Sequence, residues 1–215
     1  MENVKLTIDN KQVEVPKGTT IYKAAKEVGI DIPVLCYMNL EDIGVENKPG
    51  GCRVCSVEVE GRKNLAPACA TEVYEGMVVK THTMRVINAR RTVMEFILSD
   101  HPKDCLSCKK AGNCELQDMA VRLGIREIPG QEYAGMSTYK MDYSPSIVRE
   151  LDKCIMCRRC EAMCNDFQTV GALNAFNRGF EAAVAPAFEM DLQYSPCTYC
   201  GQCVAVCPTG ALTEV

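Results

Sequence analysis

The chain has 215 residues and a formal net charge of −4, with 24 Lys and Arg against 28 Asp and Glu. This balance excludes the basic surface that binds nucleic acid and the polybasic segment that anchors a protein to a membrane. Cysteine is unusually frequent, with 15 copies, whereas aromatic residues reach only 6% and Trp is absent. Because the count is odd and the start of the chain lacks an export signal, the cysteines predict metal binding in the cytoplasm rather than disulfides.

The first part of the chain, up to about residue 82, has the pattern of a small α+β domain. Alternating apolar residues at 4–8 and 13–15, separated by a turn, predict a β-hairpin. Apolar residues spaced i, i+3, i+4 and i+7 predict a helix over 21–28. Two further strands are predicted at Ser56–Val59 and Met77–Thr81.

Two helices are predicted in the middle of the chain. The first spans Met84–Ser99, and its expected buried stripe is Ile87, Met94 and Leu98. We expect the arginines of this helix to lie mostly elsewhere: Arg85, Arg90 and Arg91. The second helix spans Cys114–Leu123, and a linker containing Gly and Pro is expected over 126–145.

The last third contains an internal duplication. The spacing C-x2-C-x2-C-x3-C occurs over Cys154–Cys164 and again over Cys197–Cys207. Between the copies, Asn177-Arg178-Gly179 separates two alternating runs and predicts a hairpin turn. The uncharged stretch 192–213 holds four Cys, two Pro and two Gly, so we expect no transmembrane segment. The expected domains are 1–82, 83–140 and 141–215.

The duplicated spacing is typical of 4Fe–4S cubanes, in which each of four irons takes one protein ligand. A loop with Cys at every third position reaches three corners of one cubane, and the fourth Cys begins a helix that leads to the other cubane. One predicted quartet is Cys154, Cys157, Cys160 and Cys207, and the other is Cys197, Cys200, Cys203 and Cys164. Zinc is the alternative, although zinc sites usually combine two separated CxxC pairs.

Four earlier cysteines form the pattern C-x15-C-x2-C-x13-C: Cys36, Cys52, Cys55 and Cys69. An early Cys, a CxxC pair and a late Cys resemble the ligands of plant-type 2Fe–2S ferredoxins. The gap after Cys36 departs from that pattern, because plant-type proteins have a much shorter one. Gly50 and Gly51 allow backbone amides to approach the sulfur atoms. A zinc site made by the same cysteines is the alternative.

The remaining three cysteines are one ligand short of a cubane: Cys105, Cys108 and Cys114. His101 precedes them in the pattern H-x3-C-x2-C-x5-C, and an imidazole nitrogen can replace a thiolate, as in Rieske centres. We therefore predict His101 as the fourth ligand, the alternative being a residue of a His-Pro turn. His82, the other histidine, is expected at the surface. Fifteen cysteines and His101 would supply the ligands of one 2Fe–2S and three 4Fe–4S clusters.

Three segments resemble, in this order, the N-terminal iron–sulfur region of FeFe hydrogenases, particularly the NAD(P)-linked multisubunit, electron-bifurcating type: HPKDCLSCKKAGNCELQ, DKCIMCRRCEAMC and CTYCGQCVAVCPTGALTE. The resemblance covers essentially the whole chain and extends to the large iron–sulfur subunit of complex I. It implies an α+β protein with an N-terminal β-grasp 2Fe–2S ferredoxin-like domain, a small helical 4Fe–4S domain with one His and three Cys ligands, and a C-terminal bacterial-type two-cluster 4Fe–4S ferredoxin domain.

The function implied by the resemblance is single-electron transfer between a flavin- or NAD(P)H-oxidising partner and a hydrogen-forming site. A small 2Fe–2S subunit and ferredoxin are further implied partners. Every Cys is already assigned, so no catalytic centre is expected in this stretch, and no G-x-G-x-x-G or P-loop motif predicts a nucleotide site.

Two other functions remain open. One is the equivalent part of a NAD-dependent formate dehydrogenase or a complex I-like enzyme. The second complete quartet favours hydrogenase or formate dehydrogenase over complex I. The other is a zinc-stapled scaffold without redox activity.

Overall fold

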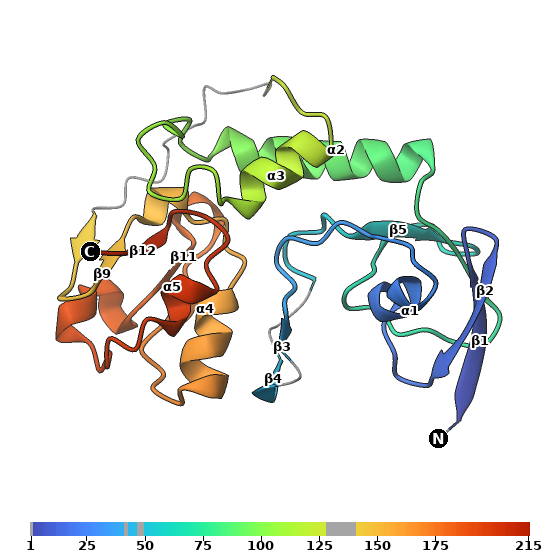
Figure 1. The fold of residues 1–215 in the computed structure, drawn as a ribbon, viewed down its shortest axis with the longest axis horizontal. Helices are drawn as coiled ribbons and strands as arrows, with labels where there is room; N and C mark the ends of the chain where they lie inside the picture. Colours follow the sequence, from blue (N-terminus) through green and yellow to red (C-terminus); the bar gives the residue numbers. More distant parts are fainter. Residues whose placement is uncertain (1, 41–42, 47–49, 128–140) are drawn as a thin grey trace. The chain divides into compact units, whose positions relative to one another are not determined.

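The computed structural model describes residues 2–40, 43–46, 50–127 and 141–215. The chain divides into two compact units. The first comprises Met1–Leu35 and Pro49–Met94, and the second comprises Cys36–Lys48 and Glu95–Val215. Figure 1 shows the elements of both, coloured along the sequence.

The first unit contains a five-stranded mixed sheet in the order β2-β1-β7-β5-β6. Its strands are β1 Asn3–Ile8, β2 Lys11–Pro16, β5 Ser56–Val59, β6 Ala66–Pro67 and β7 Met77–Lys80. β1 and β2 form the predicted hairpin, in which Leu6 is opposite Val13. β7 pairs with β1 in parallel and with β5 in antiparallel orientation, which confirms the second pair of strands. Alternate residues of β1 are buried, as the period of two predicts.

Helix α1, Ile21–Glu27, confirms the helix predicted over 21–28. The side chain of Thr20 caps its N-terminus by accepting a hydrogen bond from the backbone N–H of Lys23. The backbone N–H of Ile21 donates to the carbonyl of Thr71 at 2.9 Å. This bond ties the start of the helix to the loop that carries Cys69.

Helix α2 spans Met84–Ser99, as predicted, and buries Met94, whereas Ile87 and Leu98 of the predicted stripe are only half-buried. The expectation that its arginines lie mostly away from the core is wrong for Arg90, which is only 3% exposed. The Nε–H of Arg90 donates to the carbonyl of Ser56 at 3.0 Å. A buried carbonyl needs a donor, and helical periodicity cannot reveal that a long cationic side chain supplies it.

The second unit contains the predicted central helix as α3, Glu115–Arg122, with Cys114 at its N-cap position. It also contains an antiparallel sheet in the order β12-β9-β8. These strands are β8 Asp142–Tyr143, β9 Ile147–Arg149 and β12 Leu212–Glu214. β8 occupies the end of the stretch predicted as a linker, because a two-residue strand leaves no alternation in the sequence. Residues 128–140 of that stretch lie outside the described residues.

Short elements make up the rest of the second unit. Strands β10 Asn174–Phe176 and β11 Ala183–Ala185 pair in antiparallel orientation and confirm the hairpin predicted around Asn177. The short helices are α4 Arg159–Ala162, which continues as a π-helical turn over Met163–Phe167, and α5 Gln202–Ala205. The 3-10 helices are Leu151–Lys153, Gly179–Glu181, Ala187–Glu189 and Leu192–Tyr194.

A second hairpin lies in the long gap between Cys36 and Cys52. It consists of β3 Asn39–Leu40 and β4 Val45–Glu46. Its apolar residues join a buried group that comprises Leu40, Val45, Ala162, Met163 and Val206. The gap that departs from the plant-type pattern therefore packs against the duplicated part of the chain.

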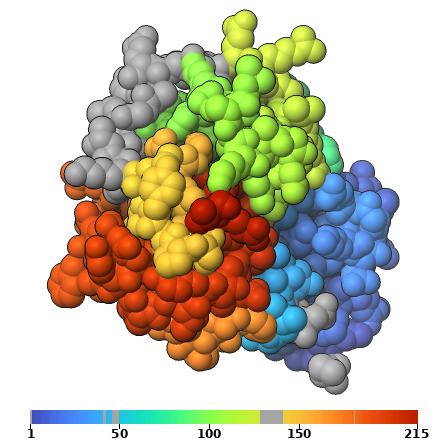
Figure 2. Space-filling view, turned by 60° about the vertical axis from the view of Figure 1, so that its left-hand side comes forward, coloured from blue at the N-terminus to red at the C-terminus, as the bar shows by residue number. Residues whose placement is uncertain are grey.

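Cysteines form part of the apolar core of the second unit. The core comprises Ile147, Cys160, Leu173, Val184, Leu192, Cys203, Cys207, Ala211 and Leu212. In Figure 2 the C-terminal segment, in red, lies between the segments coloured yellow and light green. Backbone bonds fix it there, because Glu150 N–H donates to Ala211 at 2.9 Å and Glu115 N–H donates to Pro208 at 3.0 Å. No helix in the described part of the chain is long and apolar enough to cross a membrane.

Candidate iron–sulfur sites

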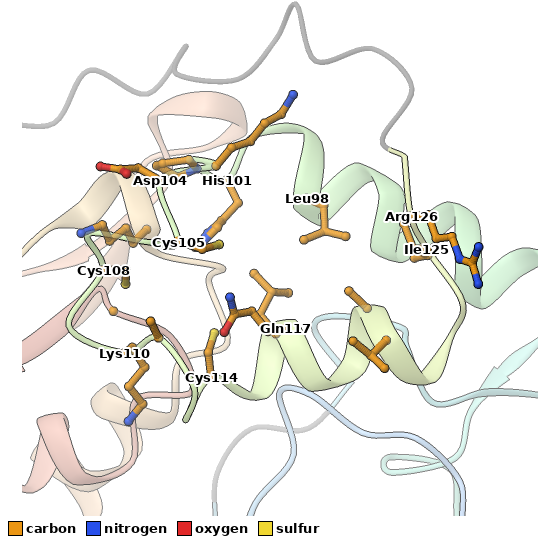
Figure 3. Close-up of a pocket in the computed structure, with 18 residues that line it drawn as sticks. Leu98, His101, Asp104, Cys105, Cys108, Lys110, Cys114, Gln117, Ile125 and Arg126 are labelled. Atoms are coloured by element: carbon orange, nitrogen blue, oxygen red, sulfur yellow. The ribbon is translucent and has the colours of Figure 1, made fainter.

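His101 and the three cysteines predicted to accompany it line one cavity of about 500 Å³ in the second unit. His101 follows the end of α2, Cys105 and Cys108 lie in the next loop, and Cys114 begins α3. In Figure 3 these side chains surround one end of the cavity, and Leu98 and Gln117 lie further along it. The chain brings together all members of this predicted quartet.

His101 is placed to act as a metal ligand. Its Nδ1 is buried and has no hydrogen-bond partner among the described residues. Burial, with a smaller contribution from the charge of Lys153, lowers the pKa of His101 from 6.5 to about 4. The ring is therefore neutral near pH 7, which is the form that binds metals. An unpartnered imidazole nitrogen beside three thiols fits a cluster ligand better than a turn residue.

Gly210 forms part of the wall of the same cavity. A Cβ added at Gly210 would lie 2.7 Å from the Sγ of Cys108, so that the sulfur atom would have to move. The glycine therefore lets the backbone reach the sulfur atom of a predicted ligand. Gly210 is three residues beyond Cys207, which belongs to a different predicted quartet.

The duplicated cysteines line two smaller cavities, and each holds one complete predicted quartet. The first cavity is lined by Cys154, Cys157, Cys160 and Cys207 among others. The second is lined by Cys164, Cys197, Cys200 and Cys203 among others. The fourth cysteine of each run thus lies with the first three of the other run. Among the described residues, no three His, Cys, Asp or Glu side chains are placed to share a single metal ion.

The two runs share one backbone geometry. The N–H of Met156 points to the Sγ of Cys154 at 3.4 Å, and the N–H of Tyr199 points to the Sγ of Cys197 at 3.4 Å. Met156 and Tyr199 are both left-handed, with φ of 52° and 55°. Amide donors of this kind stabilise negative charge on sulfur, and that is one way in which a protein adjusts the reduction potential of a cluster.

The charges around the two runs differ. Arg158 occupies the position that Gly201 has in the second run, and both are left-handed. The left-handed backbone of Arg158 is strained. The Arg158 side chain forms a forked ion pair with the buried Glu161, in which Nε and Nη2 lie 2.5 and 2.7 Å from the two carboxylate oxygens. The second run has no charged residue between Cys197 and Cys207. The duplication therefore keeps the ligands and backbone but changes the electrostatics.

A buried ion pair accompanies the first of these two quartets. Arg149 Nε lies 3.1 Å from Asp142 Oδ2, and both side chains are 5% exposed. Arg149 Nη1 has no hydrogen-bond partner among the described residues. The positive charge of Arg149 acts on Cys154 and Cys160. A buried cation with a spare donor beside clustered thiols fits a bound anionic group.

Burial raises the pKa of the core thiols. The pKa rises to about 11 for Cys154 and to about 12 for Cys157 and Cys203, with burial as the largest cause in each case. These thiols are therefore protonated at neutral pH in the protein alone. Because metals bind thiolates, loading the sites with iron must release protons.

The first unit holds three members of the earliest quartet, Cys52, Cys55 and Cys69. Cys55 and Cys69 are buried, and their Sγ atoms lie 3.3 Å apart, well beyond the ~2.05 Å of a disulfide. Gly50, with φ of 89°, approaches Ala70 closely enough that an added Cβ would lie 3.3 Å from its Cβ. Cys36 follows Leu35 directly and begins the second unit.

All fifteen cysteines lie within the described residues, and none of them forms a disulfide. His82 is exposed, as predicted, with 65% of its side chain accessible. Four residues that lie near the predicted ligands were not predicted from the sequence as part of a site: Lys153, Gly210, Arg149 and Arg159. Aligning the two cysteine runs could have identified Lys153 and Arg159, because the second run has Pro196 and Gln202 at those positions.

Three family models match successive parts of the chain. They are a 2Fe-2S iron-sulfur cluster binding domain over residues 1–84, the NADH-ubiquinone oxidoreductase-G iron-sulfur binding region over 90–129, and a 4Fe-4S dicluster domain over 153–211. The chain thus carries both 2Fe–2S and 4Fe–4S binding domains.

Longer proteins match the whole chain. It is 63% identical over 216 residues to the NADP-reducing hydrogenase subunit HndD of Solidesulfovibrio fructosivorans, covering 100% of this chain and 36% of that protein. It is 39% identical to a G-type subunit of the NADH-quinone oxidoreductase of Rhizobium meliloti (strain 1021), covering 97% of this chain and 24% of that protein. The chain therefore spans about a third of the first relative and about a quarter of the second.

A solved structure has the same fold. The chain matches a crystal structure of an NAD+-reducing NiFe-hydrogenase in the H2-reduced state with a TM-score of 0.85 and 26% identity. The match covers 98% of this chain and 87% of that chain. The chain therefore corresponds, over its whole length, to the N-terminal iron–sulfur region of an NADP-reducing hydrogenase subunit, and it is related to the G-type subunit of complex I.

Proposed function

We propose that the chain conducts single electrons through one 2Fe–2S and three 4Fe–4S clusters. Three cavities, each lined by one complete predicted quartet, are the observation that carries this proposal. Bound clusters would supply one-electron redox chemistry. The chain itself supplies the thiolate and imidazole ligands, the amide donors to sulfur and the buried surroundings that adjust the potentials.

In this proposal the ligand sets are those of the four predicted quartets. The 2Fe–2S ligands are Cys36, Cys52, Cys55 and Cys69, and the His-containing 4Fe–4S ligands are His101, Cys105, Cys108 and Cys114. The other 4Fe–4S ligands are Cys154, Cys157, Cys160 and Cys207 for one cluster and Cys164, Cys197, Cys200 and Cys203 for the other.

The proposed domain arrangement is a β-grasp domain over 1–82, a helical domain over 83–140 and a two-cluster domain over 141–215. The matches over 1–84, 90–129 and 153–211 support this division.

The physiological role that we propose is electron transfer between a flavin- or NAD(P)H-oxidising subunit and a hydrogen-forming site of the FeFe type. The 63% identity to an NADP-reducing hydrogenase subunit supports the hydrogenase context. The second complete quartet favours a hydrogenase or a formate dehydrogenase over complex I, and the FeFe type rests on the resemblance of the three cysteine-containing segments. A small 2Fe–2S subunit and ferredoxin are the further partners, and fifteen cysteines without a disulfide suit a reducing cytoplasmic setting.

A second candidate is the equivalent electron-transfer region of a complex I-like oxidoreductase. The 39% identity to a G-type subunit of an NADH-quinone oxidoreductase favours it. Both candidates assign the same electron-transfer chemistry to this stretch and differ in the enzyme that receives the electrons.

An anaerobic reductive titration of the iron-loaded chain tests the proposal. We expect the chain to take up about four electrons, one for each cluster, with an EPR signal for each reduced site. The zinc-scaffold alternative predicts a colourless protein that accepts no electrons. Uptake of no electrons by a folded, metal-loaded chain would therefore reject the proposed function.

A further inference from the structure

Lys153 lies between two of the proposed sites. Its side chain lines the cavity of His101 and Cys108, although it directly precedes Cys154 of another quartet. The side chain is only 13% exposed, so its ammonium group is poorly screened by water and salt. Its charge contributes to the lowered pKa of His101 and acts on Cys108.

Glu150 holds this ammonium group in place. The two residues form an ion pair across one turn of the 3-10 helix Leu151–Lys153, in which residues three apart lie above one another. The Glu150 side chain is 15% exposed, and Glu150 is not one of the described residues that line the cavity. Among the described residues, Lys153 therefore forms part of the wall of the His101 cavity, whereas its partner Glu150 does not.

The segment after Cys207 fixes the backbone of this turn. The hydroxyl of Thr209 donates to the carbonyl of Lys153 at 2.9 Å, and the N–H of Glu150 donates to Ala211 at 2.9 Å. Between them, a Cβ at Gly210 would lie 3.4 Å from the Cδ of Lys153. The segment 209–211, which follows the predicted ligand Cys207, therefore holds the backbone of Lys153 at the wall of the His101 cavity.

Other cations along the cavity are less suited to act on it. Lys103 and Arg126 line the cavity but are exposed, so solvent screens their charge. The amine of Lys110 points away from the cysteines in Figure 3. Lys153, by contrast, has a side chain that is only 13% exposed, and Glu150 holds its ammonium group in an ion pair.

We propose, building on the proposed function, that Lys153 sets the reduction potential of the His101 site. Reduction adds a negative charge to the site, and a fixed positive charge at the cavity wall stabilises the reduced form. Lys153 is a positioning and electrostatic residue rather than a ligand. Because it belongs to the turn that enters the Cys154 quartet, it adjusts the electron-transfer step between the two sites.

The test is a redox titration of the iron-loaded chain followed by EPR, in which the His101 signal is identified by its change in His101→Cys. We expect Lys153→Met to lower the reduction equilibrium constant of this signal about tenfold, which is ~59 mV for one electron. Lys153→Arg keeps the charge and should restore the potential. Glu150→Gln removes the negative charge but keeps a side-chain oxygen that can accept a hydrogen bond from Lys153, so it should shift the potential upward.

Lys110→Met is the matched control, because it removes the same charge from the same cavity wall with the amine directed away. Equal shifts in Lys153→Met and Lys110→Met would overturn the inference, as would a downward shift in Glu150→Gln. If Lys153→Met fails to hold the cluster, the Glu150→Gln variant tests the inference instead: an upward shift of its potential supports the inference, and a downward shift overturns it. A His101 signal that is present but insensitive to these variants rejects only this inference, whereas a wild-type chain that accepts no electrons rejects the proposed function.

Discussion

In the proposed assignment, His101 completes the ligand count, since the three cysteines beside it cannot fill a cubane alone. Its buried Nδ1 has no partner among the described residues, and its ring is neutral near pH 7. A neutral ligand in place of a thiolate makes the site less negative, so adding an electron needs less energy. The reduction potential of this site should therefore lie above that of an all-cysteine site.

Two substitutions at His101 test this role. His101→Cys should keep four irons at the site but lower its potential, and His101→Ala should leave one iron without a protein ligand and make the site labile. EPR titration and iron content of the wild type and both variants provide the measurement. Identical potentials and iron contents in all three would show that His101 is only a turn residue.

Gly210 is the second residue on which the His101 site depends. A Cβ at this position would overlap the Sγ of Cys108, at 2.7 Å. We expect Gly210→Ala to lower iron retention by about one cubane, that is, about four irons per chain. Full iron retention in Gly210→Ala would contradict the steric role.

Arg90 shows what residue patterns cannot predict. The spacing of apolar residues in α2 predicts the burial of Met94, which is confirmed. Arg90 is buried too, because the carbonyl of Ser56 needs a donor that helical periodicity does not show. The need for that donor arises only when β5 and α2 come together.

At the scale of elements, the duplicated cysteine runs exchange their fourth members. Cys207 lines the cavity of Cys154–Cys160, and Cys164 lines the cavity of Cys197–Cys203. The crossing was predictable from the sequence, because each fourth cysteine starts a helix that leads away from its own loop. What the spacing could not predict is the charge that surrounds each loop, since that depends on side chains from β8, β9 and α3.

Cys164→Ala and Cys207→Ala test the crossing and serve as controls for one another. Cys164→Ala should damage the site of Cys197–Cys203 and spare that of Cys154–Cys160, and Cys207→Ala should do the reverse. Each should also loosen the whole two-cluster part, because metal binding is coupled to folding. EPR of both variants gives the result. Loss of the Cys154–Cys160 signal in Cys164→Ala would reject the crossed assignment.

Arg159 connects three elements of the second unit. Its guanidinium, 4% exposed, forms a forked pair with Glu115 at 2.7 and 2.8 Å, at the start of α3. A further N–H lies 3.5 Å from the carbonyl of Tyr37, in the segment after Cys36. Removal of Glu115 would leave the buried guanidinium of Arg159 without this carboxylate partner.

We expect Glu115→Gln to reduce the free energy of unfolding by about 2 kcal/mol, because Glu115 is half-exposed and Arg159 is buried. This corresponds to a fall in Tm of about 4–8 °C for a chain of this size. Asp118→Asn, an exposed carboxylate on the same helix, is the matched control and should change Tm little. Equal Tm values for the two variants would show that the forked pair contributes nothing to stability.

At the scale of the whole molecule, cysteines help to fill the core of a chain that has few aromatic residues and no Trp. Cys160, Cys203 and Cys207 are core residues of the second unit. The sequence predicts the hairpin, α1, α2 and α3, because local periodicity and capping determine them. It does not predict the long gap after Cys36, where β3 and β4 pack on Met163 and Val206, because those partners are more than a hundred residues away in the chain.

The iron and sulfide content of the anaerobically reconstituted chain tests the four-cluster assignment most directly. The four ligand sets predict about 14 irons and about 14 inorganic sulfides per chain, with no stoichiometric zinc. A plateau near 10 irons in folded protein would remove one cubane and contradict the count of fifteen cysteines plus His101. Stoichiometric zinc without sulfide would contradict the electron-transfer function as a whole.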